Sequence, residues 1–181
     1  ITYCESSLSG KRDRALISVG YDTLSRRSEL VSISIEDVFF SEKGGRILIK
    51  RAKNDPFGKG RISHLHPKTV CYLKEWINAA NITKGPLFRA IKHDKIQSKS
   101  LHPYSVNRII KKTALRAGLD KERIQKLSGH SMRVGAAQDM MIAGLDILPI
   151  MAAGGWKTTN VVARYIENAD LSPLVSQFFE K

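Results

Sequence analysis

The sequence has few cysteines and no long apolar run. Its two cysteines, Cys4 and Cys71, form neither a disulfide framework nor the ligand spacing of a zinc site, and such a pair is typical of a reducing cytoplasm. No apolar segment approaches the roughly 20 residues that cross a bilayer, and no signal peptide opens the chain. No Walker loop, internal repeat or low-complexity segment is present either. These absences argue against a disulfide-rich secreted protein, a helical membrane protein and a P-loop nucleotide hydrolase.

Acidic residues are scarce beside basic ones. Thirty Lys and Arg face seventeen Asp and Glu, which leaves a net charge of +13 and a pI near 9.9. A surplus of this size in a folded chain favours a polyanionic partner, and nucleic acid fits better than an anionic membrane surface. The alternative is a basic protein that its charge keeps soluble. The length of 181 residues and the 42% hydrophobic content suit one ordinary globular core.

The first third of the chain predicts two helices and a small sheet. Apolar residues recur at helical spacing over residues 11–21, and a short second helix is expected over 26–32. Residues 38–40, 46–50 and 61–65 read as strands, and turn-forming residues fill 54–60. We therefore expect a small antiparallel sheet that carries a basic loop.

Helices are expected to dominate after Pro67, which suits a first helical position. Further helices are predicted at about 104–117, 131–143, 147–153 and 159–169, and Ser172-Pro173 opens a last apolar one. The predicted fold class is α+β, mainly α-helical, with one domain and a small antiparallel sheet.

Four short motifs carry side chains suited to chemistry at an anion. They contain Arg26 and Glu29; His130 and Arg133; Trp156 after two glycines; and Tyr165. Each has an ordinary explanation when it is taken alone. An arginine-rich first turn is usually solvated, a His–Arg pair is usually a surface contact, and a Trp or Tyr at helical spacing usually packs in a core.

Taken in this order, the motifs resemble the phage-integrase or tyrosine-recombinase family. Residues 21–30, YDTLSRRSEL, are similar to the family's first arginine box, and residues 128–140, SGHSMRVGAAQDM, resemble its His-x-x-Arg box. The AGGW of residues 153–156 and Tyr165-Ile166 complete the pattern, which extends from about Lys11 to Asp170. Many members have His where this chain has Trp156, and most have a second His where it has Val134.

The resemblance implies the fold of the family's catalytic domain and a site-specific recombinase or integrase that cleaves and rejoins double-stranded DNA through a 3′-phosphotyrosyl intermediate. Tyr165 would be the nucleophile, and Arg26 and Arg133 would clamp the scissile phosphate, because an arginine fork binds two phosphate oxygens. His130 and the Trp156 N–H would add donors to the same oxygens. Arg27 competes with Arg26 for the first position, and Arg26 is preferred because it stands three residues before Glu29.

Two supporting roles follow from the same resemblance. Glu29 would orient its neighbours, and a lysine on the hairpin would protonate the 5′-oxygen that leaves. Lys53 fits that lysine, with Lys50 and Lys59 as competitors. No metal ion, nucleotide or other cofactor is required.

The resemblance also implies a domain organisation and partners. Residues 1–170 would form the catalytic domain, and residues 171–181 a helical tail that docks on a neighbouring protomer or folds back on its own core. A homotetramer on DNA is expected, with a monomer in its absence and no membrane contact. The helical domain that usually precedes the catalytic one is not in this sequence, so the chain is an excised domain or a naturally short protein. We expect a cytoplasmic, nucleoid-associated protein of bacterial or phage origin.

Two other functions remain open. A type IB topoisomerase or a telomere resolvase would use the same chemistry on the same fold. A DNA-binding accessory protein without catalysis is the second alternative, although it would have no need to keep all six catalytic residues.

Overall fold

A small antiparallel sheet packs beside the first helices. The computed structural model describes residues 3–50, 60–167, 169–170, 172 and 176. Strands β1 (Val38–Ser41), β2 (Gly44–Ile49) and β3 (Arg61–Leu65) follow one another in the sheet. Ile47 of β2 stands opposite Val38 on one side and Ser63 on the other. Ile47 and Ile49 are buried while Arg46 is exposed, so one face of β2 meets the helices and the other meets solvent. The predicted sheet is confirmed.

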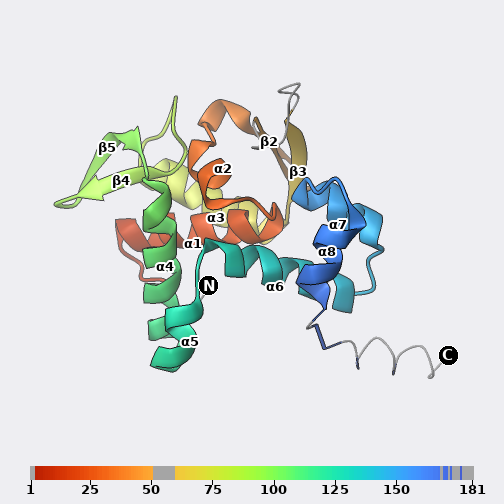
Figure 1. Cartoon of the computed structure of the whole chain (residues 1–181). Helices are drawn as coiled ribbons and strands as arrows, with labels where there is room; N and C mark the ends of the chain where they lie inside the picture. Colours follow the sequence, from red (N-terminus) through yellow and green to blue (C-terminus); the bar gives the residue numbers. More distant parts are fainter. Residues whose placement is uncertain (1–2, 51–59, 168, 171, 173–175, 177–181) are drawn as a thin grey trace.

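Helices form most of the rest of the described structure, as predicted (Figure 1). They are α1 (Leu8–Asp22), α2 (Arg27–Ser32), the 3-10 helix η1 (Ile35–Asp37), α3 (Pro67–Ala79), α4 (Pro103–Arg116), α5 (Lys121–Lys126), α6 (Gly129–Ile142), α7 (Ile147–Gly154) and α8 (Thr159–Ile166). Helix α6 begins two residues before the predicted Ser131, because the Ser128 hydroxyl accepts the His130 N–H at 3.2 Å and caps the helix. Helix α8 ends at Ile166, three residues before the predicted end. Most of the last predicted helix lies outside the described residues.

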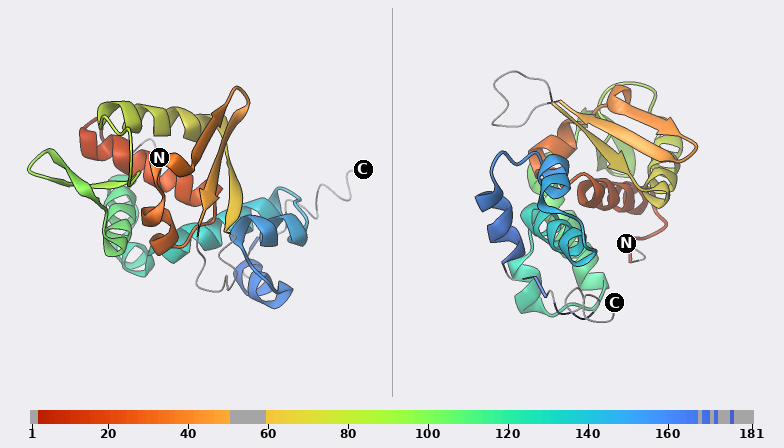
Figure 2. Two further views of the ribbon diagram at one scale, coloured as in Figure 1. Left: turned by 90° about the horizontal axis from the view of Figure 1, so that it is seen from above. Right: turned by 90° about the vertical axis from the view of Figure 1, so that its right-hand side faces the viewer.

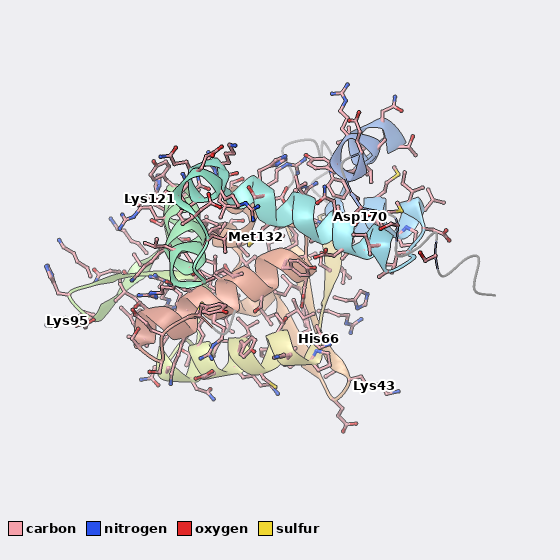
Figure 3. All side chains as sticks on the ribbon, turned by 90° about the horizontal axis from the view of Figure 1, so that it is seen from below. Lys43, His66, Lys95, Lys121, Met132 and Asp170 are labelled. Carbon is pink, nitrogen blue, oxygen red and sulfur yellow. The ribbon has the colours of Figure 1, made fainter. Side chains whose placement is uncertain are left out.

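A second hairpin was not predicted. Strands β4 (Arg89–Lys92) and β5 (Lys95–Ser100) pair through a turn in which His93 and Asp94 both have positive φ, 49° and 56°. This is the backbone of a tight two-residue hairpin turn, which usually contains Gly or Asn. The strands lack apolar alternation because they project from the molecule, with Lys95 at the tip (Figure 3). The short helix α5 also escaped prediction, and none of its residues is buried.

Helix α6 crosses between two apolar cores. The larger core packs α1 against α3 and the sheet, and the Trp76 indole in it donates to the Leu87 carbonyl at 2.9 Å. The smaller core joins the C-terminal half of α6 to α7 and α8 (Figure 2). Met132, labelled in Figure 3, packs against the larger core, while Ala136 one turn later belongs to the smaller one. The first turn of α6 is therefore fixed where the two cores meet.

Within the described residues, no helix is long and apolar enough to span a bilayer.

The packing of α1 predicts a large cost for truncating a side chain there. Leu16 has no solvent-exposed surface, so Leu16→Ala should lower the free energy of unfolding by about 2–5 kcal/mol. Leu148→Ala, at a leucine that is 66% exposed, is the matched control and should change it by less than about 0.5 kcal/mol. Urea denaturation followed by circular dichroism measures both, and equal effects would contradict this assignment of the core.

Candidate anion-binding and catalytic site

A basic pocket of about 390 Å³ opens where α2, α4 and α6 meet. It is lined by Arg26, Arg27, Ser28, Asn107, Ser128, Gly129, His130 and Arg133. Among the described residues, three arginines and no acidic side chain line it. A concave surface of this composition suits a phosphate or another multivalent oxyanion.

Arg26 lies at the N-cap of α2 and lines the pocket. The Glu29 carboxylate accepts the Arg26 backbone N–H at 3.0 Å and its Nη1 at 2.7 Å. Glu29 is 3% exposed, so this contact holds the base of Arg26 firmly. Glu29 thus contacts Arg26, the residue three positions before it. Arg27 lines the same pocket, but of the two arginines Glu29 holds Arg26.

Arg133 is the most deeply buried arginine of the pocket, at 2% exposure. Its Nη2 donates to the Gly154 carbonyl at 2.6 Å, and its Nη1 donates to the Leu24 carbonyl. The guanidinium carbon lies 4.1 Å from the centre of the Trp156 ring, a cation–π contact. Burial and the charge of Arg26 lower the pKa of Arg133 to about 10, so it remains charged at neutral pH.

Tyr165 packs between two of the predicted site residues. Its ring centre lies 5.1 Å from that of His130 and 5.2 Å from that of Trp156. Tyr165 is half-buried against the smaller core, and its backbone carbonyl accepts the Gln138 amide at 3.0 Å. Packing therefore holds the phenol beside His130, which is one of the residues that line the pocket.

The turn before Trp156 requires both of its glycines. Gly155 ends α7 with φ +64°, a left-handed conformation that glycine adopts without strain. A Cβ at Gly154 would lie 2.2 Å from the Trp156 ring, so a side chain at that position would displace the indole. Trp156 is 8% exposed, so packing in the smaller core is by itself a sufficient reason for a Trp at this position.

The lysine candidates divide into two groups. Lys53 and Lys59 lie outside the described residues. Lys50, the third candidate, has its Nζ 2.5 Å from the carboxylate of buried Asp37. That carboxylate holds the Lys50 ammonium in an ion pair.

Sequence reasoning missed two residues of this region. Asn107 accepts the Gly129 N–H at 2.8 Å and fixes the start of α6. Arg61, at the start of β3, donates to Glu29 at 3.3 Å and to the Ala153 carbonyl at 3.0 Å. The sequence treats Arg61 as the polar first residue of a strand, and its contacts with Glu29, Thr23 and Ala153 appear only in the folded structure.

Comparison with known proteins decides the family. The model of the phage integrase family matches residues 1–171. A xerD-type integrase/recombinase homolog from Selenomonas ruminantium is 37% identical over 92% of this chain and 50% of its own length. The chain belongs to the phage integrase family. The Cre recombinase of Escherichia phage P1 is 33% identical over 88% of this chain and 50% of its own length. This phage integrase family chain thus spans about half the length of the curated relatives it matches.

Solved structures of the family have the same fold. The XerH site-specific recombinase bound to palindromic difH substrate, in a post-cleavage complex, aligns with a TM-score of 0.75 at 21% identity over 98% of this chain and 48% of that one. The XerA recombinase aligns with a TM-score of 0.73 at 22% identity over 95% of this chain and 57% of that one. The predicted fold, that of a tyrosine recombinase catalytic domain, is confirmed.

The metal question can be asked of the described residues alone. Over residues 3–50 and 60–167, and the few described beyond them, no three His, Cys, Asp or Glu side chains gather as metal ligands would.

The charges around His130 predict its titration. Burial, Arg133 and Arg26 lower its pKa below the ordinary 6.5, so the imidazole is neutral at pH 7. Arg26→Gln removes one repulsive charge and should raise this pKa. NMR titration of the ring protons measures the change, with Arg46→Gln on exposed β2 as the control for loss of a distant charge.

The same shift links His130 to stability. Because the pKa is lower in the folded protein, protons bind the unfolded chain more tightly. The stability that neutral His130 contributes is present above pH 6.5 and is lost as the pH falls from 6.5 through the lowered pKa. A folded-state pKa above 6.5 would contradict this description of the site.

Proposed function

We propose that this chain is the catalytic part of a site-specific recombinase or integrase that cleaves and rejoins double-stranded DNA through Tyr165. The observation that carries the proposal is the position of Tyr165. Its ring contacts His130, and His130 lines a pocket with three arginines. A phenol beside a pocket lined by three arginines supports transesterification at phosphorus.

The pocket residues would stabilise charge on the phosphate. Displacement at phosphorus builds negative charge on the equatorial oxygens, and fixed donors aimed at them lower the barrier. Arg26 and Arg133 enter the pocket from helices that are far apart in sequence, so together they suit two sides of one phosphate. His130 would donate to the same oxygens once the anion raises its pKa, and the Trp156 N–H would add a donor.

Tyr165 would attack the phosphorus. Its phenolic oxygen forms the new bond to phosphorus, and the 5′-oxygen of the next nucleotide leaves with a proton. A phenol of ordinary pKa near 10 is both a usable nucleophile and a tolerable leaving group, so the link to the DNA 3′ end is reversible. We assign the proton to Lys53, with Lys59 as the alternative, since Lys50 is held by Asp37. Nothing in this scheme requires a metal ion or nucleotide.

The partners follow from the same proposal. Duplex DNA is the substrate, and the XerH relative of similar fold was solved bound to its difH substrate. We further propose that residues 1–170 are the catalytic domain and that a homotetramer forms on DNA. Residues 171–181, most of which lie outside the described part of the chain, would dock on a neighbouring copy or fold back on their own core. Such a substrate would place the protein in the cytoplasm, at the nucleoid.

Tyr165→Phe should abolish covalent capture of DNA and leave noncovalent binding within about twofold, because the substitution removes one hydroxyl and keeps the ring packing. The assay incubates the chain, without metal, with nicked duplexes taken from sequence flanking the gene. A denaturing gel then detects the protein–DNA adduct, and a gel shift measures binding. Tyr104→Phe, at a tyrosine that is 62% exposed on α4, is the matched control and should still form the adduct.

The other outcomes of this assay separate the alternatives. Adduct formation that persists in Tyr165→Phe would show that another residue is the nucleophile. Tight binding without any adduct would favour an accessory DNA-binding protein. An adduct together with relaxation of supercoiled plasmid, and no exchange of partners, would favour a type IB topoisomerase.

The net charge of +13 predicts steep salt dependence. If Lys and Arg neutralise about six phosphates, affinity should fall roughly 1000-fold between about 50 and 200 mM salt, through release of condensed counterions. Fluorescence anisotropy with a labelled duplex measures the slope. A flat dependence would mean that the basic surplus does not contact the DNA backbone.

A further inference from the structure

Arg61 lies beside the pocket, and each of its three guanidinium nitrogens donates a hydrogen bond to a protein atom. Its Nε donates to the Ala153 carbonyl at 3.0 Å, its Nη1 to Glu29 at 3.3 Å, and its Nη2 to the Thr23 carbonyl at 3.0 Å. The side chain is 12% exposed and is not among the residues that line the pocket. Arg61 is therefore placed to act through its neighbours and not as a phosphate ligand.

Its backbone contacts run parallel to those of Arg133. Arg61 binds the carbonyls of Thr23 and Ala153, and Arg133 binds those of the next residues in each segment, Leu24 and Gly154. The two arginines thus fasten the end of α1 to the end of α7 side by side. Its two carbonyl contacts, together with the bond to Glu29, keep the Arg61 guanidinium from turning toward the pocket.

The contact with Glu29 has an electrostatic consequence. Glu29 is 3% exposed and accepts hydrogen bonds from both Arg26 and Arg61. One buried carboxylate between two guanidinium groups leaves a net charge of +1 on the three side chains. Without Arg61, Glu29 would be balanced by Arg26 alone, and the net charge would be zero.

We propose that Arg61 is a positioning residue that neutralises Glu29, so that the charge of Arg26 remains available to a phosphate in the pocket. This inference rests on the phosphate-binding role proposed above. Arg26 is the more solvent-exposed of the two arginines, with 35% of its side chain accessible against 12% for Arg61. The buried arginine balances the carboxylate, and the accessible one faces the ligand.

The test measures binding of inorganic phosphate, followed by the NMR shift of the His130 ring. Arg61→Gln should weaken phosphate binding roughly tenfold, which is the order of magnitude expected when one positive charge near a partly buried anion site is removed. Adding Glu29→Gln to this variant removes the carboxylate that Arg61 balances, and should restore binding to within about threefold of wild type. Arg46→Gln removes a charge from exposed β2 and should change binding by less than about twofold.

The double variant distinguishes charge balance from structural support. A loss in Arg61→Gln that Glu29→Gln fails to rescue would overturn the proposal, since Arg61 would then act only by holding α1 to α7. Unchanged binding in Arg61→Gln would overturn it as well. If Arg61→Gln does not fold, Arg61→Lys decides: it keeps the charge, so binding within about threefold of wild type supports the proposal, and a tenfold loss overturns it.

Phosphate binding is measured without DNA, so the result is independent of cleavage. The wild type could bind phosphate, and Glu29→Gln could rescue Arg61→Gln, while no DNA gives an adduct. That outcome would support the role of Arg61 and count against the proposed recombinase function. No response of His130 to phosphate in the wild type would overturn the inference itself.

Discussion

The buried guanidinium of Arg133 is the interaction on which the site depends. It lies at 2% exposure and binds carbonyls from the ends of α1 and α7, two segments more than a hundred residues apart. Leaving such a cation without partners would cost several kcal/mol, so the chain folds with those carbonyls in place. The same guanidinium packs on the Trp156 ring, and that ring packs against Tyr165. The position of the phenol thus follows from the satisfaction of one buried charge.

The site concentrates positive charge that the protein alone balances only in part. Arg26, Arg61 and Arg133 lie close enough for their charges to act on one another, and buried Glu29 is the carboxylate among them. Mutual repulsion of this kind is relieved by a bound anion. Under the proposed function, part of the free energy cost of holding the arginines together would be recovered when phosphate binds. Burial lowers the pKa of His130, and the neighbouring charges of Arg133 and Arg26 lower it further because they disfavour the protonated form.

Much of the fold could be predicted because its signals are local. Alternation marked β2, Pro67 marked the start of α3, and glycines marked the helix ends. The β4–β5 hairpin gave no such signal: its strands project from the core and its turn uses His93 and Asp94 in place of glycine. The start of α6 was placed too late because its cap, Ser128, lies inside a motif that was interpreted as chemistry.

The candidate site, like the fold, could be predicted from the sequence only in part. The sequence by itself determined which residue types the site would use, since arginine, histidine, tryptophan and tyrosine in a particular order identify the family. It also determined that His130 and Arg133 lie on one helix face, because residues three apart are neighbours on a helix. The spacing to Glu29 favoured Arg26 over Arg27, and in the structure Glu29 contacts Arg26. Only the tertiary structure decided that Asp37 binds Lys50 and that Arg61 belongs beside the site. These outcomes depend on which charges are buried together, and burial is a property of the packed fold that no local pattern encodes.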